Sequence, residues 1–432
     1  MPETITSEDA QYALDFVKAI CTQVGPGLPG TSQEWQRASI IKNELESHLG
    51  AANVFVEEFT LAPGAFLGAY PLSALFMLMA ALLNISIGRF TDIPPWGTSI
   101  AALALSIISA LLLIFEFILG FELIDPFFKK KQSENVIGKL RKPGTNNVKR
   151  LLILSGHHDS ALENTWLRFL GYGFMPASAT LFIGFINLLA MSIIQLAGVI
   201  TGNSAIVRTG TLGWVLLVYP VVPSIIYLMF FNMGRKNGGT VPGAADNLSA
   251  SALAVAMCRF LVKNPAYIPA DTEIRLISFG SEEAGVRGSR RYVARHLDEL
   301  KRLEVRLLNF ETVAHPEISI LTSDSNGTVK NSPEMVNSVV AAAKRAGVPY
   351  KVKPAFIGIG GDAGPFSQAG FHALTLLPFQ TPQQWVAFYH QKWDTPDVLT
   401  IEPLLNVLKL AFEWVRCGGP STKDPDQKED IP

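Results

Sequence analysis

Four long apolar runs, arranged in two pairs, interrupt an otherwise mixed pattern of hydrophobic and polar positions. The first pair covers residues 69–88 and 98–121, and the second pair covers residues 169–200 and 212–231. An α-helix of about 20 apolar residues crosses a hydrocarbon core of about 30 Å. Because a short polar segment joins the two runs of each pair, the pattern predicts two transmembrane hairpins.

Outside the hairpins, short apolar runs alternate with segments of helical periodicity. Strands are predicted at residues 151–156, 273–280, 305–310 and 373–379, and helices at 249–263, 288–303 and 333–346. Continuous apolar strands that alternate with helices are typical of a parallel sheet covered on both faces. We therefore predict an α/β fold: a three-layer α/β/α domain with a mostly parallel sheet, into which four transmembrane helices are inserted as two hairpins.

These elements divide the sequence into a discontinuous α/β domain, two insertions and a tail. The α/β domain is predicted to comprise residues 1–61, 131–164 and 237–417, the hairpins residues 62–130 and 165–236, and the tail residues 418–432. The tail is polar and rich in proline, so it is predicted to be disordered. The chain starts with an amphipathic helical pattern after Ser7 and not with a basic and then apolar segment, so no cleaved signal peptide is expected.

Composition agrees with a membrane-embedded protein. Only 17% of the residues are charged, against about 25% in an ordinary soluble domain, and 48% are hydrophobic. The 36 basic and 37 acidic side chains nearly cancel, so no charge excess indicates a nucleic-acid partner. Cys21, Cys258 and Cys417 are far apart and lack C-x-x-C spacing, which favours reduced thiols over a disulfide framework or a thiolate metal site.

Basic residues near the apolar runs predict the orientation in the membrane. On the side of the α/β domain they are Lys129, Lys130, Lys131, Arg168, Arg235 and Lys236, whereas the two far loops contribute Arg89 and Arg208. Loops rich in lysine and arginine remain in the cytoplasm. We therefore expect a multi-pass membrane protein with its α/β domain on the cytoplasmic side.

Candidate chemistry gathers in five short motifs at or just after the predicted strand ends, where open α/β sheets place their sites. The motifs are Gly156-His-His-Asp-Ser160, Gly243-Ala-Ala-Asp-Asn247, Ser281-Glu-Glu-Ala-Gly285, Asn309-Phe-Glu-Thr312, and Tyr389-His390 followed by Asp394-Thr395. Together they offer two imidazoles and three carboxylates as metal ligands. This set suits two Zn²⁺ ions that share a carboxylate and a water molecule.

Two local spacings indicate which of these residues could bind metal, orient a ligand or transfer a proton. Asp159 follows His157 by two residues, so on an extended strand end it can accept the second imidazole N–H and fix the tautomer. Glu282 and Glu283 are adjacent, which allows one carboxylate to bind metal while the other handles the proton of an attacking water.

The order of the five motifs and the residues in them resemble the M28 family of co-catalytic zinc aminopeptidases. The resemblance covers the α/β domain and does not include either hairpin. The resemblance implies hydrolysis of the N-terminal bond of a peptide with a free amino terminus. It implies that one zinc is bound by His157, Asp246 and Glu311, and the other by Asp246, Glu283 and His390. It also implies that Glu282 is the general base and that Asp159 orients His157. The substrate pocket implied by the resemblance includes Asp362 and Tyr389. Asp246 would bridge the two ions.

The sequence also departs from the family pattern. Position 311 is Glu where the family commonly has Asp, His158 replaces a common Tyr, and Ala363 replaces a common His. These changes leave the substrate class open. The alternatives are a zinc enzyme similar to glutaminyl cyclases or carboxypeptidases, and a non-catalytic membrane scaffold of the same fold.

Overall fold

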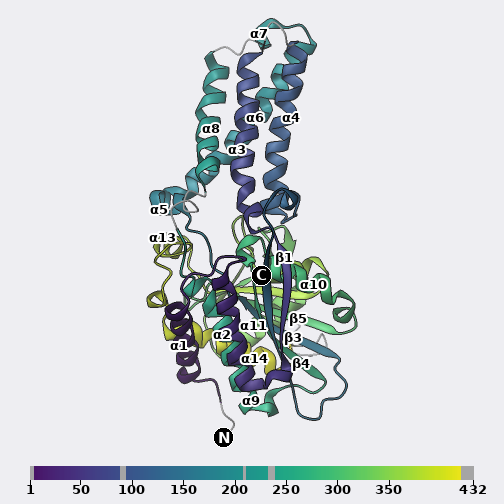
Figure 1. The fold of residues 1–432 in the computed structure, drawn as a ribbon, viewed down its shortest axis with the longest axis vertical. Coiled ribbons are helices and arrows are strands. Elements are labelled where there is room, and N and C mark those ends of the chain that lie inside the picture. Colours follow the sequence, from purple (N-terminus) through teal and green to yellow (C-terminus); the bar gives the residue numbers. More distant parts are fainter. Residues whose placement is uncertain (1–3, 88–93, 208–210, 232–238, 420–432) are drawn as a thin grey trace. The chain divides into compact units, whose positions relative to one another are not determined.

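The chain forms two compact units in the computed structural model, which describes residues 4–87, 94–207, 211–231 and 239–419 (Figure 1). The sheet unit comprises Met1–Pro63, Lys129–Leu162 and Thr240–Pro432, and the helical unit comprises Gly64–Phe128 and Glu163–Gly239. Each unit is therefore assembled from segments that are separated in the sequence.

An eight-stranded mixed sheet with the order β1-β2-β4-β3-β5-β10-β6-β9 is the centre of the sheet unit. The strands are β1 (Val54–Leu61), β2 (Lys131–Arg141), β3 (Arg150–His157), β4 (Thr272–Phe279), β5 (Glu304–Phe310), β6 (Ile318–Leu321), β9 (Tyr350–Lys353) and β10 (His372–Leu377). The four central strands are parallel, as predicted. Strands β1 and β2 add antiparallel pairs at one edge, and β6 pairs antiparallel with β10.

Helices cover both faces of this sheet, which confirms the α/β fold class (Figure 1). The helices are α1 (Ser7–Gln23), α2 (Ser32–Leu49), α9 (Ser249–Lys263), α10 (Arg287–Leu300), α11 (Pro333–Ala346), α12 (Ala363–Gln368) and α14 (Ile401–Arg416). On one face, Ile153, Phe279 and Leu307 form a buried cluster with Tyr292 of α10 and Phe366 of α12. Successive side chains of a strand point to opposite faces, and on the other face α9 packs against β3, β4 and β5 while α11 packs against β6 and β10.

The parallel strands bring their carboxyl ends to one edge of the sheet. Strand β3 ends at His157, β4 is followed by the turn Glu282–Ala284, and β5 is followed directly by Glu311. The segment Ala244–Leu248 leads into α9, which packs against β3 and β4. Four of the five motifs are therefore delivered to the same edge by the topology of the sheet.

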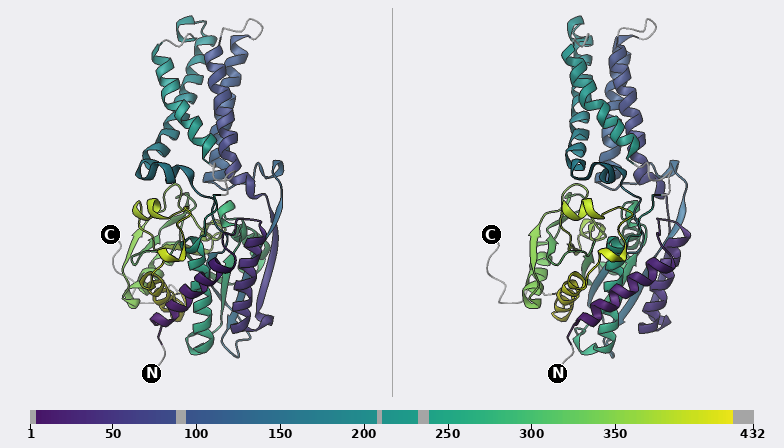
Figure 2. Two further views of the ribbon diagram at one scale, coloured as in Figure 1. Left: turned by 60° about the vertical axis from the view of Figure 1, so that its left-hand side comes forward. Right: turned by 90° about the vertical axis from the view of Figure 1, so that its left-hand side faces the viewer.

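The helical unit consists mainly of four long apolar helices, and both views of Figure 2 show them side by side. They are α3 (Pro63–Ser86), α4 (Pro95–Leu113, continued by a π-turn to Ile118), α6 (Phe174–Ile200, preceded by α5 at Thr165–Leu170) and α8 (Thr211–Phe230). These helices correspond to the four predicted spans. By length and composition, Pro63–Ser86, Pro95–Ile118 and Thr165–Ile200 can cross a membrane, with mean hydropathies of 2.0, 2.5 and 2.1.

One further helix meets the same length and hydropathy criteria but has another role. The segment Ala244–Lys263 has 89% of its apolar window buried within the structure, and it belongs to the sheet unit. A spanning helix exposes its apolar surface to lipid, whereas this one is covered by strands and other helices. It is therefore a core helix of the sheet unit.

Several buried polar side chains pair with one another inside the helical unit. The Ser73 hydroxyl of α3 donates to the Ser109 carbonyl of α4 at 2.9 Å, and the Ser109 hydroxyl donates back to the Ser73 carbonyl at 2.8 Å. The Asn84 amide donates to the Ser192 hydroxyl of α6 at 2.8 Å, and Ser192 lies 3.1 Å from the hydroxyl of Ser106. These contacts join α3, α4 and α6.

Part of the sequence-based prediction concerns residues outside the described ranges. Arg89, Arg208, Arg235 and Lys236, which were counted for the orientation, lie in the ranges 88–93, 208–210 and 232–238. Most of the predicted tail, residues 420–432, is also outside the described part of the chain.

Candidate metal centre

His157 and Asp159 lie at and just beyond the end of β3, and both are fully buried. The His157 Nδ1 atom is 3.3 Å from the Asp159 Oδ1 atom, so the carboxylate faces the imidazole. Asp159 also accepts the backbone N–H groups of Glu282 and Glu283, both at 3.0 Å. One carboxylate thus fixes both an imidazole and the turn that carries the two glutamates.

A first group of metal-binding side chains surrounds the other ring nitrogen of His157. The His157 Nε2 atom lies 3.5 Å from Asp246 Oδ1 and 3.6 Å from Glu311 Oε1. Glu282 approaches from another side, with its Oε2 atom 3.7 Å from the same nitrogen. His157, Asp246 and Glu311 each present one ligand atom, and these three atoms lie within 4.8 Å of one another.

A second group shares Asp246 with the first. The His390 Nε2 atom is 3.0 Å from Asp246 Oδ2 and 3.2 Å from Glu283 Oε1. The ligand atoms of Asp246, Glu283 and His390 also lie within 4.8 Å of one another. The two oxygens of Asp246 therefore face two different histidines, in the arrangement that a bridging carboxylate requires.

The geometry inside the second group fits a cation better than hydrogen bonds. Asp246 Oδ2 and Glu283 Oε1 are buried and have no hydrogen-bond partner among the described residues, although the His390 nitrogen is close to both. Buried carboxylate oxygens without partners are energetically costly. Imidazole and carboxylate donors at this spacing suit zinc, which binds nitrogen and oxygen ligands at about 2.0–2.2 Å.

Electrostatics lead to the same conclusion. Burial, together with the charges of Asp246 and Asp362, raises the pKa of Glu311 to about 8, although His157 opposes the shift. Burial is also the main cause that raises the pKa of Glu282 and of Glu283 above the usual value. These carboxylates repel one another when they are ionised. A divalent cation removes that penalty by favouring the carboxylate forms.

His390 responds to the same charges in the opposite sense. Burial lowers its pKa, but the carboxylates of Glu283 and Asp246 outweigh burial and raise the pKa to about 10. The ring is also stacked on the neighbouring Tyr389 ring, with centroids 4.0 Å apart and planes 14° apart. Tyr389, a predicted pocket residue, therefore lies beside a predicted metal ligand.

The remaining residues singled out in the sequence have different positions. Asp362, the other predicted pocket residue, is fully buried at the start of α12, and burial raises its pKa to about 7. His158 is also buried, but its Nδ1 atom contacts the Ser278 hydroxyl at 2.9 Å. Burial lowers the pKa of His158 to about 3, so this histidine is a neutral core residue.

Sequence reasoning assigned no role to two residues that support the ligands. Asp394 accepts the backbone N–H groups of Ala245 at 2.7 Å and Asp246 at 3.0 Å. The Asn247 amide donates to Glu311 Oε2 at 3.1 Å, which orients that carboxylate. Asp394 and Asn247 both belong to the five motifs, and this position in the sequence could have indicated a supporting role.

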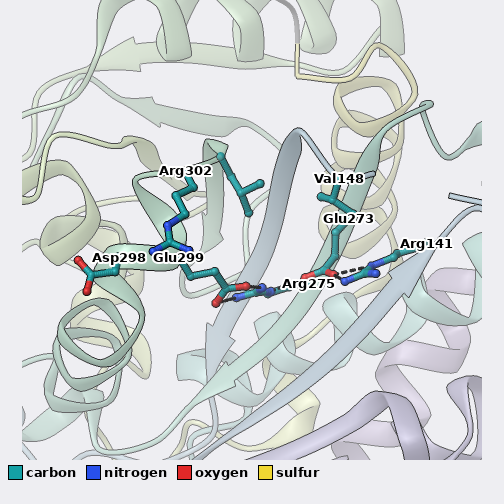
Figure 3. Close-up of a pocket in the computed structure, with 8 residues that line it drawn as sticks. Arg141, Val148, Glu273, Arg275, Asp298, Glu299 and Arg302 are labelled. Atoms are coloured by element: carbon teal, nitrogen blue, oxygen red, sulfur yellow. Dashed lines mark hydrogen bonds and ion pairs between the residues drawn. The ribbon is translucent and has the colours of Figure 1, made fainter. Parts of the chain in front are cut away.

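A separate pocket of about 340 Å³ lies at the other end of the sheet (Figure 3). Its lining includes Glu273 and Arg275, from the amino-terminal half of β4, whereas the glutamate turn follows the carboxyl end of that strand. Arg275 lies between Glu273 and Glu299, and Arg141 pairs with the other oxygen of Glu273. The charges in this pocket therefore neutralise one another, unlike those of the metal centre.

Comparison with known proteins identifies relatives of this arrangement. Residues 232–415 match the family model described as peptidase family M28. The chain is 29% identical over 182 residues to "Aminopeptidase YwaD" of Bacillus subtilis (strain 168). That alignment covers 40% of this chain and 34% of the relative, so it spans about a third of the relative's length.

Solved structures share the fold at low sequence identity. The zinc aminopeptidase BSAP from Bacillus subtilis matches with a TM-score of 0.51 and 17% identity, covering 94% of this chain and 93% of that chain. A glutaminyl cyclase from an Acidobacteriales bacterium matches with a TM-score of 0.53 and 13% identity, covering 96% and 95%. An aminopeptidase from Aneurinibacillus sp. strain AM-1 matches with a TM-score of 0.52 and 15% identity, covering 96% and 94%.

The structural matches show the fold alone, because all three are below 25% identity. The family model covers the segments that carry Asp246, Glu283, Glu311 and His390. Together with the aminopeptidase relative, that match shows that residues 232–415 are similar to peptidase family M28.

Proposed function

We propose that this protein is a membrane-bound di-zinc exopeptidase that hydrolyses the N-terminal bond of peptides. The observation that carries the proposal is the pair of ligand groups that share Asp246: His157 with Glu311 on one side, and Glu283 with His390 on the other. Two such groups with one common carboxylate are the donor set of a two-metal site.

The residues of the chain divide the chemistry between them. When bound, zinc polarises the scissile carbonyl and lowers the pKa of a water molecule. Glu282 lies beside the first group, with its Oε2 atom 3.7 Å from His157 Nε2, and with His157 and Glu283 it could also hold a metal ion. We assign its carboxylate the role of general base, which takes the proton of the water and passes it to the leaving amine. Burial raises the pKa of Glu282 above its usual value, which favours uptake of a proton by this carboxylate.

Asp159 keeps Glu282 in place for this step. It accepts the backbone N–H groups of both glutamates and faces His157, so a ligand and the general base are held by the same buried carboxylate. Asp394 has a similar role for Asp246, through the backbone N–H groups of residues 245 and 246. Partners of this kind orient metal ligands and general bases.

The decisive experiment replaces Glu282 by Gln in the full-length protein. We expect Glu282→Gln to keep its zinc, as measured by elemental analysis, and to lose at least about 10²-fold in turnover of a free-amino peptide. Glu402→Gln, on the exposed face of α14, is the matched control and should keep full activity. Undiminished hydrolysis by Glu282→Gln would contradict the proposal.

A second candidate follows from the structural likeness to glutaminyl cyclases. Such an enzyme would cyclise an N-terminal glutamine and release ammonia, whereas an aminopeptidase releases the first residue. A panel of peptides that begin with Gln or Leu, each with a free or an acetylated amino terminus, separates the two reactions. An aminopeptidase should release the first residue of the Leu peptide when its amino terminus is free and not when it is acetylated.

The helical unit is proposed to span the membrane, with the sheet unit in the cytoplasm. Apolar side chains such as Leu82 and Ile186 remain exposed on the helices, as expected for contact with lipid. The lysine and arginine bias of the flanking segments supports the orientation. Cys417 is exposed whereas Cys258 is buried, so Cys417 is the reporter. An impermeant thiol reagent should label Cys417 only after the cells are opened, and labelling in intact cells would reverse the orientation.

A further inference from the structure

Helix α2 buries two charged side chains one turn apart, Glu34 and Arg37, and both have no exposed surface. The helix starts after Thr31, whose hydroxyl accepts the Glu34 N–H at 3.4 Å. Burial raises the pKa of Glu34 to about 8 and lowers that of Arg37 to about 10, so the fold disfavours the charged form of each. Buried charges contribute little net stability, so the role of these two side chains has to be sought in the groups that they bind.

Glu34 binds the residue immediately before the two catalytic-site glutamates. Its Oε1 atom accepts the Ser281 N–H and the Ser281 hydroxyl, both at 2.8 Å, and the Ser133 hydroxyl at 3.0 Å. Its Oε2 atom accepts the Gly30 N–H at 2.6 Å. Ser281 has a φ of 54°, a left-handed conformation that is unfavourable for a side chain with a Cβ atom. The carboxylate therefore stabilises a backbone turn that would not form readily without a partner.

This turn determines where the two glutamates point. The three consecutive N–H groups of Ser281, Glu282 and Glu283 donate to two buried carboxylates, Glu34 for the first and Asp159 for the other two. Successive N–H groups in such a turn form a concave binding site for anions. Here the site is filled by the protein itself, so the orientation of the turn depends on both carboxylates.

Arg37 binds two further ligand-bearing segments. Its Nη1 atom donates to the carbonyl of His158, the residue after His157, at 3.0 Å. Its Nη2 atom donates to the carbonyl of Pro242, four residues before Asp246, at 2.6 Å. A guanidinium has several donors in a fixed plane, so one side chain can hold both segments at a set separation.

We propose that Glu34 and Arg37 are positioning residues through which α2 sets the mutual spacing of three ligand-bearing segments of the metal centre. They bond to backbone and hydroxyl groups of those segments, and their further hydrogen bonds go to Gly25, Gly30 and Ser133 and not to each other. The proposal rests on the zinc-dependent function proposed above. It adds a contribution of α2, which carries no predicted ligand, to metal affinity.

The test measures zinc binding and cobalt spectra of the full-length protein in detergent. For Glu34→Gln we expect the zinc Kd, from competition with a chromophoric chelator, to rise about 10–100-fold, the usual effect of losing an outer partner of a metal ligand. The visible spectrum of the Co²⁺ form should change, because the ligands around the metal shift. The kcat for peptide hydrolysis should fall with KM near the wild-type value.

Glu44→Gln is the matched control on the same helix. Glu44 bonds to Tyr12, away from the metal centre, so its loss should lower stability without changing the zinc Kd or the cobalt spectrum. Arg37→Lys keeps the charge but loses the planar fork, and should weaken zinc binding in the same direction. Ser133→Ala removes one donor to Glu34 and should produce a smaller change, so it decides the question if Glu34→Gln does not fold.

The possible outcomes separate this proposal from the proposed function. Unchanged zinc affinity and cobalt spectra in the folded variants would overturn the positioning role, even if the wild-type protein hydrolyses peptides. Altered zinc affinity and cobalt spectra in a protein that hydrolyses no peptide would support the positioning role and reject the exopeptidase. Both measurements are made without substrate, so neither depends on the reaction.

Discussion

A charged cluster of the sheet unit and a serine pair of the helical unit are both buried, but their polar groups are satisfied in different ways. In the sheet unit, carboxylates and imidazoles converge at the strand ends, and oxygens of Asp246 and Glu283 lack hydrogen-bond partners among the described residues. In the helical unit, Ser73 and Ser109 exchange two hydrogen bonds across a helix pair. The first cluster needs a cation to complete it, whereas the serine pair is complete in itself.

This difference predicts which changes affect function and which affect only stability. Removal of one ligand from the charged cluster leaves the other buried charges without compensation. Removal of one hydroxyl from the neutral pair costs only a hydrogen bond between groups that were never charged. The following changes test this contrast.

The largest effect is expected for Asp246→Asn. Asparagine keeps the size of the side chain but loses the negative charge that both ligand groups share. We expect zinc content after dialysis to fall sharply and peptide turnover to fall by more than about 100-fold, beyond the usual effect of losing an outer partner. Asp298→Asn is the control, because Asp298 is exposed and lines the pocket at the other end of the sheet (Figure 3). This variant should retain its zinc content and its peptide turnover. Full zinc content in Asp246→Asn would contradict a shared ligand.

Removal of the metal should have the next largest effect. A ligand at 100 times its Kd stabilises a protein by about 2.7 kcal/mol, and without zinc the ionised carboxylates of the centre repel one another. A chelator should therefore lower the midpoint of thermal unfolding of the sheet unit, and added zinc should restore it. Magnesium is the control ion, because it prefers an all-oxygen environment with several waters. An unchanged midpoint of thermal unfolding in the presence of chelator would show that the sheet unit is not stabilised by a bound metal ion.

The contrast also explains which features the sequence could predict. Continuous apolar runs identified β3, β4, β5 and β10, because buried central strands need no polar alternation. Strands β1 and β2 went unpredicted, because β1 is an edge strand with interrupted burial and β2 buries the polar residues Ser133, Glu134 and Asn135. The ligand motifs were visible because parallel strands bring their carboxyl ends together.

Supporting residues far away in the sequence could not be found in this way. Glu34 lies 247 positions before Ser281, and a glutamate in the first turn of an amphipathic helix normally faces water. Only the packing of α2 against the sheet shows that it is buried. Asp394 was visible as part of a motif, but its bonds to the backbone at Ala245 and Asp246 depend on a loop whose path the sequence does not specify.

Glu134 is a carboxyl group outside the ligand set, and a change at this residue is expected to have a moderate effect on stability. Burial, with the nearby charges of Glu34 and Glu58, raises the pKa of Glu134 from 4.5 to about 9. Between these values the unfolded chain has lost the proton that the folded chain keeps, so the contribution of Glu134 to stability is complete below pH 4.5 and is lost as the pH rises to 9.

Glu134→Gln cannot ionise and should not show this loss. We expect the variant to match the wild-type protein near pH 5 and to exceed it by about 1 kcal/mol, a typical size for one substitution, as the pH approaches 9. Urea unfolding at several pH values, at fixed free zinc, measures the difference. Parallel curves for the two proteins across this range would show that Glu134 ionises normally.

The smallest effect is expected in the helical unit, where Ser73 and Ser109 form a reciprocal pair. Ser73→Ala, Ser109→Ala and the double variant form a thermodynamic cycle, and hydrogen bonds between membrane helices average about 0.6 kcal/mol in such cycles. Unfolding in mixed detergent micelles gives the coupling energy. Ser86→Ala is the control in α3, because its hydroxyl donates to the Leu83 carbonyl of its own helix. Zinc content should stay constant in all of these variants, since the pair is neutral, and a change in it would show that the two polar clusters are coupled.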